Sequence, residues 1–207
     1  QGREVHPSPA ILDALAGALR LTPDAREHLH RLRDATTEPA TAPRVDDPPL
    51  DDALLTRMTA LVASVRPHPA YVLDRLGNVV AANPEGLALH GFSGTGAPRN
   101  TCRYLLTDPR AQEVFVEWEE LARGAVAHLR AANADTLDDP QLQALVAELT
   151  EASPLFARWW GEHVVERRRS ATKHLRLPDG SVVARHYEVL HLPEEGLRMT
   201  LWLTPRD

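Results

Sequence analysis

The chain has 207 residues, of which 43% are hydrophobic, and this length and composition fit one globular domain with a smaller element beside it. Its formal net charge of −6 argues against non-specific binding to nucleic acid or to an anionic membrane, and no apolar run approaches the roughly 20 residues that cross a bilayer. The single cysteine, Cys102, excludes an internal disulfide and a cysteine-rich metal site, which favours a reducing, cytoplasmic compartment.

Residues 1–35 carry the pattern of two short helices. Ser8 and Pro9 form a helix start, and Thr22 with Pro23 repeats the signal. Two helices of this length cannot bury a core of their own, so we expect them to be the end of a larger helical domain. Because the chain begins with Gln1 and not with Met, we expect that part of this domain precedes it.

A proline-rich stretch, residues 36–50, predicts a semi-extended linker. The helical spacing of Leu54, Met58 and Val62 then predicts a helix over residues 51–65. A β-hairpin follows over residues 70–83, with its turn at Gly77.

The remainder of the chain predicts helices and then three strands. Apolar stripes indicate helices over residues 110–130, 140–149 and 153–163, and turn residues separate strands near 171–177, 181–192 and 197–204. In the last strand, alternation predicts one buried face and one more polar face. Because an isolated hairpin is marginal in water, both β parts must share one sheet. The expected fold is therefore α+β, an antiparallel sheet with inserted helices, as in PAS domains.

Several stretches resemble, in order and spacing, the ligand-binding domain of MmyB-like transcription regulators of the Xre type. They are "PAYVLDRLGNVVAAN" (69–83), "RNTCRYLLTDPRA" (99–111), "VEWEELARGAVAHLRA" (116–131), "DDPQLQALVAELTEASPLFARWWGEHVV" (138–165) and the closing strands. Residues 7–32 resemble the final helices of a lambda-repressor-like helix-turn-helix domain. One departure is Val164, where the family has an acidic residue after its tryptophan-histidine motif.

The resemblance implies three parts: the end of a helix-turn-helix domain (1–35), the linker (36–50) and a PAS-like ligand-binding domain (51–207). It implies a bacterial transcription regulator that binds a small apolar or fatty-acid-like molecule and passes the signal through the helix of residues 50–65. The expected partners are operator DNA, in the full-length protein only, and a second copy in a homodimer, with no membrane. The alternative is a ligand-free dimerisation or structural module.

The expected ligand site has a polar end and aromatic walls. An arginine pairs well with a carboxylate, so Arg99, Asn100 and Arg103 are candidates for the polar end, although ion pairs with Asp108 or Glu113 are the more common role of arginines at a helix start. The full set of candidate ligand-binding residues is Asn83, Arg99, Asn100, Arg103, Trp118, Phe156, Trp159, His163 and Tyr187. The aromatic members could instead belong only to the core.

The sequence offers little support for an enzyme or a metalloprotein. The histidines between residues 163 and 191 lack metal-binding spacing, and the glycine-rich stretch 91–98 lacks the Lys-Ser/Thr of a phosphate loop. Cys102 is expected to be a buried, inert thiol. We therefore expect no catalytic residue, metal or cofactor other than the ligand. The arginines at 167–169 should form a solvated edge, with contact to DNA phosphate as the alternative.

Overall fold

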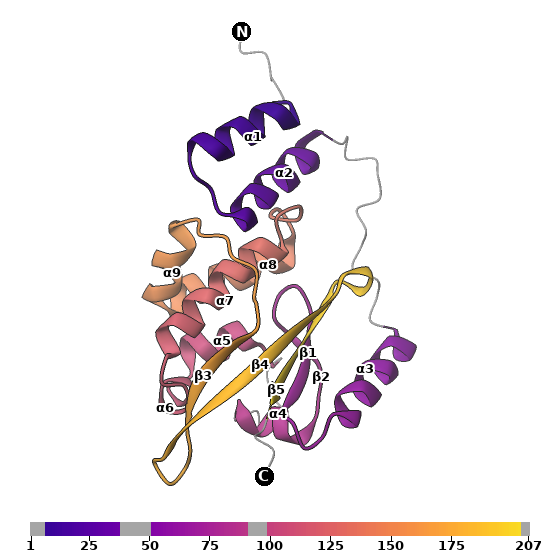
Figure 1. Cartoon of the computed structure of the whole chain (residues 1–207), viewed down its shortest axis with the longest axis vertical. Helices are drawn as coiled ribbons and strands as arrows, with labels where there is room; N and C mark the ends of the chain where they lie inside the picture. Colours follow the sequence, from indigo (N-terminus) through magenta and orange to yellow (C-terminus); the bar gives the residue numbers. More distant parts are fainter. Residues whose placement is uncertain (1–6, 38–50, 91–98, 204–207) are drawn as a thin grey trace.

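The computed structural model describes residues 7–37, 51–90 and 99–203 (Figure 1). Most of the expected linker and the glycine-rich stretch 91–98 lie outside these residues. The helices are α1 (Pro9–Ala18), α2 (Pro23–Thr37), α3 (Asp52–Ser64), α4 (Pro84–Leu89), α5 (Thr101–Thr107), α6 (Arg110–Val114), α7 (Trp118–Ala132), α8 (Pro140–Ala152) and α9 (Pro154–Gly161). The strands are β1 (Ala70–Leu73), β2 (Val79–Ala82), β3 (Ala171–Arg176), β4 (Val182–Leu192) and β5 (Leu197–Leu203), with a 3₁₀ turn, η1 (Pro193–Glu195), between the last two.

The five strands form one antiparallel sheet in the order β2-β1-β5-β4-β3. The last strand, β5, lies in the centre, where Thr200 pairs with Tyr71 of β1 and Leu201 pairs with Glu188 of β4. Helices α4 to α9 are inserted between β2 and β3 (Figure 1). The expected α+β, PAS-like arrangement is therefore confirmed.

The sheet separates two hydrophobic cores. On its outer face, Leu197 and Met199 of β5 pack with α3, whereas Trp202 of the same strand joins the larger core under the inserted helices. Alternation along β5 thus sends successive side chains into different cores. The face that the sequence marks as polar is not solvated, because Thr200 is only 3% exposed and Trp202 only 2% exposed.

The single helix expected over residues 110–130 is in fact two helices. The break lies at Phe115, which forms a β-bridge with Leu175, and Val116 N–H donates to the carbonyl oxygen of His174 at 3.0 Å. These bonds join the inserted helices to the edge strand β3. They replace the helical bonds that a continuous helix would have made.

The two N-terminal helices pack on each other, and α2 also contacts the end of α7 and the residues after it. Ser8 caps α1, since its hydroxyl oxygen accepts from Ile11 N–H, and Leu12 is buried. From α2, the Arg31 guanidinium donates to the carbonyl oxygen of Ala131 at 2.8 Å and pairs with Asp135 at 2.7 Å. None of the helices within the described ranges has the length and apolarity that a bilayer span requires.

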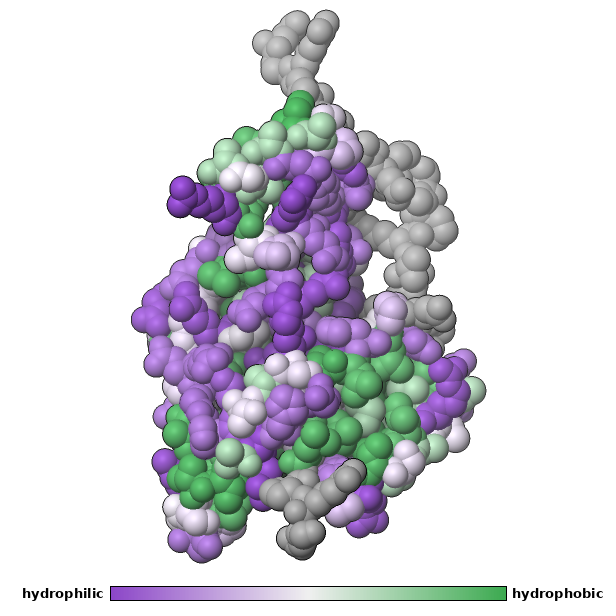
Figure 2. Space-filling model, viewed as in Figure 1, coloured by the Kyte–Doolittle hydropathy of each residue, from purple (hydrophilic) through white to green (hydrophobic). Residues whose placement is uncertain are grey.

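The outer face of the sheet is only partly covered by α3. Hydrophobic residues gather on the surface around α3 and the neighbouring strands, whereas hydrophilic residues dominate over the inserted helices (Figure 2). Leu190 of β4 is 50% exposed and lies opposite Met199, so both side chains share this outer face.

Candidate ligand site

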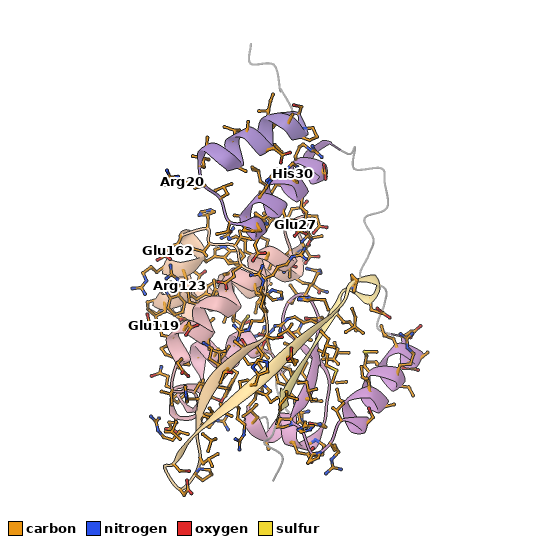
Figure 3. All side chains as sticks on the ribbon, in the orientation of Figure 1. Arg20, Glu27, His30, Glu119, Arg123 and Glu162 are labelled. Carbon is orange, nitrogen blue, oxygen red and sulfur yellow. The ribbon has the colours of Figure 1, made fainter. Side chains whose placement is uncertain are left out.

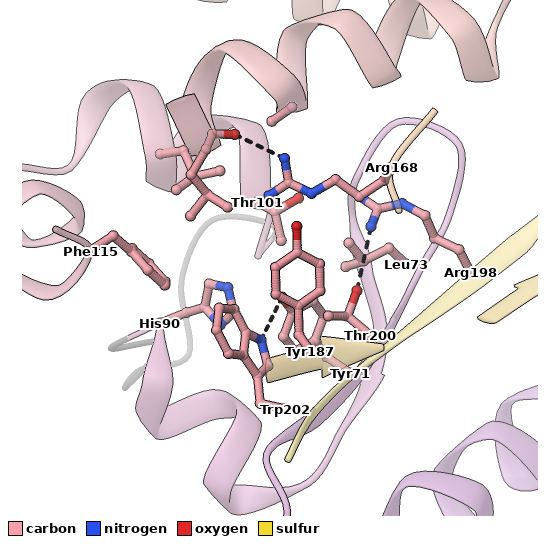
Figure 4. Close-up of a pocket in the computed structure, with 13 residues that line it drawn as sticks. Tyr71, Leu73, His90, Thr101, Phe115, Arg168, Tyr187, Arg198, Thr200 and Trp202 are labelled. Carbon is pink, nitrogen blue, oxygen red and sulfur yellow. Dashed lines mark hydrogen bonds between the residues drawn. The ribbon is translucent and has the colours of Figure 1, made fainter. Parts of the chain in front are cut away.

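A cavity of about 20 Å³ lies between the inner face of the sheet and the inserted helices (Figure 4). That volume has room for about one water molecule. Its apolar and aromatic lining is Tyr71, Leu73, Leu105, Phe115, Leu121, Ala125, Tyr187 and Trp202, and its polar lining is His90, Thr101, Arg168, Arg198 and Thr200.

Two arginines reach this cavity from different parts of the chain (Figure 4). Arg198 rises from β5 and donates to the hydroxyl oxygen of Thr200 at 3.5 Å. Arg168 donates to the carbonyl oxygen of Leu121 at 3.0 Å, and its guanidinium carbon lies 5.8 Å from the ring centroid of Tyr187. Across the described residues, no carboxylate oxygen lies within 4.0 Å of either guanidinium.

The electrostatics of the cavity favour an anion. Burial, and then the nearby positive charge of Arg168, lower the pKa of Arg198 to about 10. A charge taken out of water without a partner costs free energy, and an arginine is the side chain best shaped to bind an oxyanion in a bidentate manner. Two guanidiniums beside an apolar lining are the chemistry that pairs with a carboxylate or phosphate group.

The position of Arg168 follows from the bonds made by the segment that carries it, residues 166–169. Glu166 N–H donates to the carbonyl oxygen of Ala127 at 3.5 Å, and Arg168 N–H donates to Nδ1 of His128 at 3.1 Å. These bonds fix the segment against α7. A Cβ at Gly124 would lie 2.9 Å from Nη1 of Arg168, so glycine leaves the guanidinium room to lie against the helix.

A groove of about 480 Å³ adjoins the cavity on the other side of Arg168. It runs between α7 and residues 164–171, and its lining includes several basic side chains, among them Arg123 and Lys173. Leu121, Arg168 and Tyr187 line both spaces. Arg168 therefore separates the internal cavity from the surface groove.

The buried titratable groups of this region are held neutral. His90 lies 4.6 Å from Tyr71, centroid to centroid, in an edge-on contact, and its Nδ1 donates to the carbonyl oxygen of Gly86 at 3.2 Å. Burial lowers the pKa of His90 to about 4 and raises that of the Cys102 thiol to about 11. Neither group is charged near neutral pH.

The nine candidate residues do not converge on the cavity. Of them, Tyr187 lines it, and Asn100 is next in sequence to Thr101, which also lines it. The side chains of the two asparagines bond to the protein backbone and to other side chains of the fold. Asn83 caps α4 and Asn100 caps α5, and each side chain makes four hydrogen bonds to protein atoms.

The arginines expected at the polar end lie elsewhere. Arg103 forms a two-bond pair with Glu148 at 2.6 and 2.7 Å, on the surface between α5 and α8. The contacts of Arg103 therefore favour an ion pair, and its partner is Glu148, not Asp108 or Glu113. Arg99 precedes α5 and does not line the cavity. His163 is exposed, with a φ of 55° just after α9.

The candidate aromatic walls pack in the larger core away from the cavity. Phe156 and Trp159 are buried there, and Phe156 stacks on Trp160 with ring centroids 5.6 Å apart. Trp118 is half-buried, and its indole N–H donates to the carbonyl oxygen of Leu105 at 2.6 Å. The aromatic residues that do line the cavity are Tyr71, Phe115, Tyr187 and Trp202.

One signal in the sequence points to the missed residues. In β5, Arg198 shares a face with Thr200 and Trp202, an arginine and a tryptophan on one side of a strand. A buried Trp202 requires that other elements cover this face of β5, and Arg198 on the same face then lies beneath them. No group of three or more His, Cys, Asp or Glu side chains in the described parts of the chain is placed to hold a metal ion.

The fold is a PAS-like sheet with inserted helices and a small cavity between them. Residues 55–207 match the family described as "MmyB-like transcription regulator ligand binding domain". The chain belongs to this family, which is a class of transcription regulator and not of enzyme.

Among solved structures, the chain is similar to one described as the PAS domain of an HTR-like protein from Haloarcula marismortui. The sequence identity is 15% and the TM-score is 0.29, with 74% of this chain and 98% of that chain covered. The comparison with curated proteins finds no match.

Proposed function

We propose that this chain is the sensory part of a cytoplasmic bacterial transcription regulator. Its PAS-like domain takes up a small molecule with an apolar body and an acidic group, such as a fatty acid. Occupancy then alters operator binding by a helix-turn-helix domain to which α1 and α2 belong. Family membership supports the regulator and its ligand-binding domain.

The single observation that carries the choice of ligand is the pair of arginines at the cavity. Arg168 and Arg198 reach an apolar space, and the part of the chain that the structure describes supplies no carboxylate for them. A ligand with an acidic group satisfies both guanidiniums, while its apolar body replaces contacts of Phe115 and Trp202. In this proposal Arg168 and Arg198 replace Arg99 and Arg103 as the polar end.

In this proposal the structure shows the cavity in its ligand-free, contracted arrangement. About 20 Å³ is too small for an alkyl chain, so binding requires an expanded arrangement of the lining side chains. A ligand that binds only the expanded arrangement shifts the population toward it. Such a shift is the means by which a ligand can change the rest of the protein.

The test compares ligands of equal chain length. Dodecanoate and dodecyl phosphate should each bind the full chain at least about ten-fold more tightly than dodecanol, because a charge-assisted pair with arginine is lost in the alcohol. Calorimetry gives the affinities, and the two acids distinguish a carboxylate from a phosphate ligand. Native mass spectrometry of the purified protein identifies any acid that it already carries.

The variants locate the acidic group. Arg198→Met and Arg168→Met should abolish the preference for acids over the alcohol. Arg103→Met, a matched control, should leave it unchanged because Arg103 pairs with Glu148 on the surface. Arg198→Met should also keep or raise stability, since it removes a half-buried charge that has no carboxylate partner among the described residues. If wild type binds the acids and the alcohol with equal affinity, Arg168 and Arg198 do not bind the acidic group and the proposal is wrong.

The small volume also favours a second candidate, a ligand-free dimerisation module whose interior is filled by side chains. In that case acids and alcohol alike should fail to bind, and no small molecule should co-purify. Operator binding by the full-length protein would then be independent of added dodecanoate. A gel shift at several dodecanoate concentrations separates the two functions.

A further inference from the structure

Residues 166–169, the arginine segment, lie outside the helices and strands, and the side chains of its three arginines go to two different sides. Arg168 points to the cavity (Figure 4). Arg167 and Arg169 point the other way and contact α2. Arg167 and Arg169 are exposed to solvent, as the sequence favours, with side chains 41% and 62% exposed, and each also has an acidic partner on α2.

The contacts with α2 centre on one carboxylate. Asp24, in the first turn of α2, is buried, and it accepts from Arg167 N–H at 3.1 Å and from the Arg169 guanidinium at 2.6 Å. Burial alone would raise the pKa of Asp24, but these hydrogen bonds outweigh it and the pKa is lowered. Glu27, one turn further along α2, pairs with the Arg167 guanidinium. Figure 3 shows Glu27 on the side of α2 that faces the inserted helices.

The opposite side of the segment is bonded to α7. Arg168 N–H donates to Nδ1 of His128, which can accept only while that nitrogen is unprotonated, and burial holds the pKa of His128 well below its usual value. The Arg168 side chain donates to the carbonyl oxygen of Leu121. One short segment outside the helices and strands is thus held between α7 and α2.

We propose that the arginine segment couples the ligand cavity to the N-terminal helices. A ligand larger than a water molecule must displace part of the cavity lining, and Arg168 is carried by this irregular segment instead of by a helix or strand. Movement of Arg168 draws Arg167 and Arg169 away from Asp24 and Glu27. The N-terminal end of α2 is then released, while Arg31 still holds its middle to Ala131 and Asp135.

The proposal rests on the proposed function, and it fixes the sign of the coupling. If ligand binding weakens the contact between the segment and α2, that contact must weaken ligand binding by the same factor. Removal of the α2 contact should therefore tighten ligand binding. This outcome is opposite to that of a substitution that merely damages the domain.

Asp24→Asn in the full chain tests the sign, with Asp13→Asn as the matched control. Asp13 pairs with Arg26 and His30 inside the N-terminal helices and does not contact the arginine segment. We expect Asp24→Asn to tighten dodecanoate binding at least about five-fold, within the usual range of coupling between two sites. Asp13→Asn should bind as wild type does. Unchanged or weaker binding by Asp24→Asn overturns the proposal.

Amide hydrogen exchange of α2 supplies a readout that needs no ligand. Exchange in the first turns of α2 should become faster in Asp24→Asn, in Arg168→Met and in wild type with dodecanoate. If dodecanoate does not bind wild type, the proposed ligand class fails, and Arg168→Met alone decides the coupling. Faster exchange of α2 in that variant supports it, because the hydrogen bonds of Arg168 go to His128 and Leu121 and not to α2, and unchanged exchange overturns it.

Discussion

His90 makes stability depend on pH in a predictable direction. Its folded-state pKa of about 4 lies below the unfolded value of 6.5. Between these two pH values the unfolded chain binds a proton at His90 and the folded protein does not. The stability from neutral His90 is fully present above pH 6.5 and is lost as the pH falls toward 4. A shift of this size corresponds to about 3 kcal/mol.

We expect urea denaturation of wild type to show this loss between pH 7 and pH 4, and to show a smaller loss for His90→Phe. Phenylalanine keeps an aromatic ring beside Tyr71 but does not titrate. His128 adds a loss of the same sign in both proteins, because its pKa is also lowered by burial. Equal slopes for the two proteins would show that His90 is not the titrating group.

Asn83 joins three elements through four hydrogen bonds. Its side-chain oxygen accepts from Ala70 N–H at 3.0 Å and from Gly86 N–H at 2.8 Å. Its amide donates to the carbonyl oxygens of Val62 and His68 at 3.1 and 2.8 Å. Asn83→Ala leaves four backbone groups without this partner, so we expect a loss of about 3–5 kcal/mol in urea denaturation.

The same variant tests whether Asn83 belongs to the ligand site. Asn83 does not line the cavity, so the folded fraction of Asn83→Ala should bind dodecanoate as wild type does. If Asn83→Ala is fully folded without urea and still fails to bind dodecanoate, Asn83 belongs to the ligand site.

At the scale of elements, α4 packs closely on β1 because position 86 is a glycine. A Cβ there would lie 2.4 Å from the carbonyl oxygen of Ala70, a backbone atom that cannot turn aside. Gly86→Ala should therefore lower stability by about 1–3 kcal/mol, measured by chemical denaturation. Gly17→Ala on α1 is the matched control, since no atom lies within 4 Å of the added methyl, and it should keep or raise stability.

The elements that the sequence predicts well are those whose signals are local. The Gly77 turn between two short strands and the Asn83-Pro84 helix start each lie within a few residues, and the structure contains both. The break at Phe115 depends instead on His174 and Leu175, about 60 positions further along the chain. No local pattern near Phe115 contains that information.

The cavity was harder to predict for the same reason. Arg198 becomes interior only because helices inserted far earlier in the chain cover its side of β5. Arg168 faces inward through a backbone bond to His128, which is 40 positions away. Sequence spacing therefore identified the domain, but the polar residues that it favoured lie at the start of α5, whereas the arginines that line the cavity come from β5 and the arginine segment.

At the scale of the whole molecule, we expect a homodimer through the outer face of the sheet. Leu190, Leu201 and Leu203 lie on this face beside α3, where Figure 2 shows hydrophobic surface. An exposed apolar patch of this kind is typical of protein interfaces. Leu190→Glu should weaken self-association at least about ten-fold in sedimentation equilibrium with little change in thermal stability. A wild-type protein that is monomeric at high concentration would contradict this expectation.

The central position of β5 also has a consequence during synthesis on the ribosome. The pairs β1–β2 and β3–β4 are complete before β5 is made, yet they contact each other in the sheet only through β5. A two-stranded hairpin is marginally stable alone, so the nascent chain must carry both pairs without the strand that joins them until residues 197–203 emerge. Translation pauses just before β5 should therefore increase aggregation or chaperone binding of this protein more than pauses before α3.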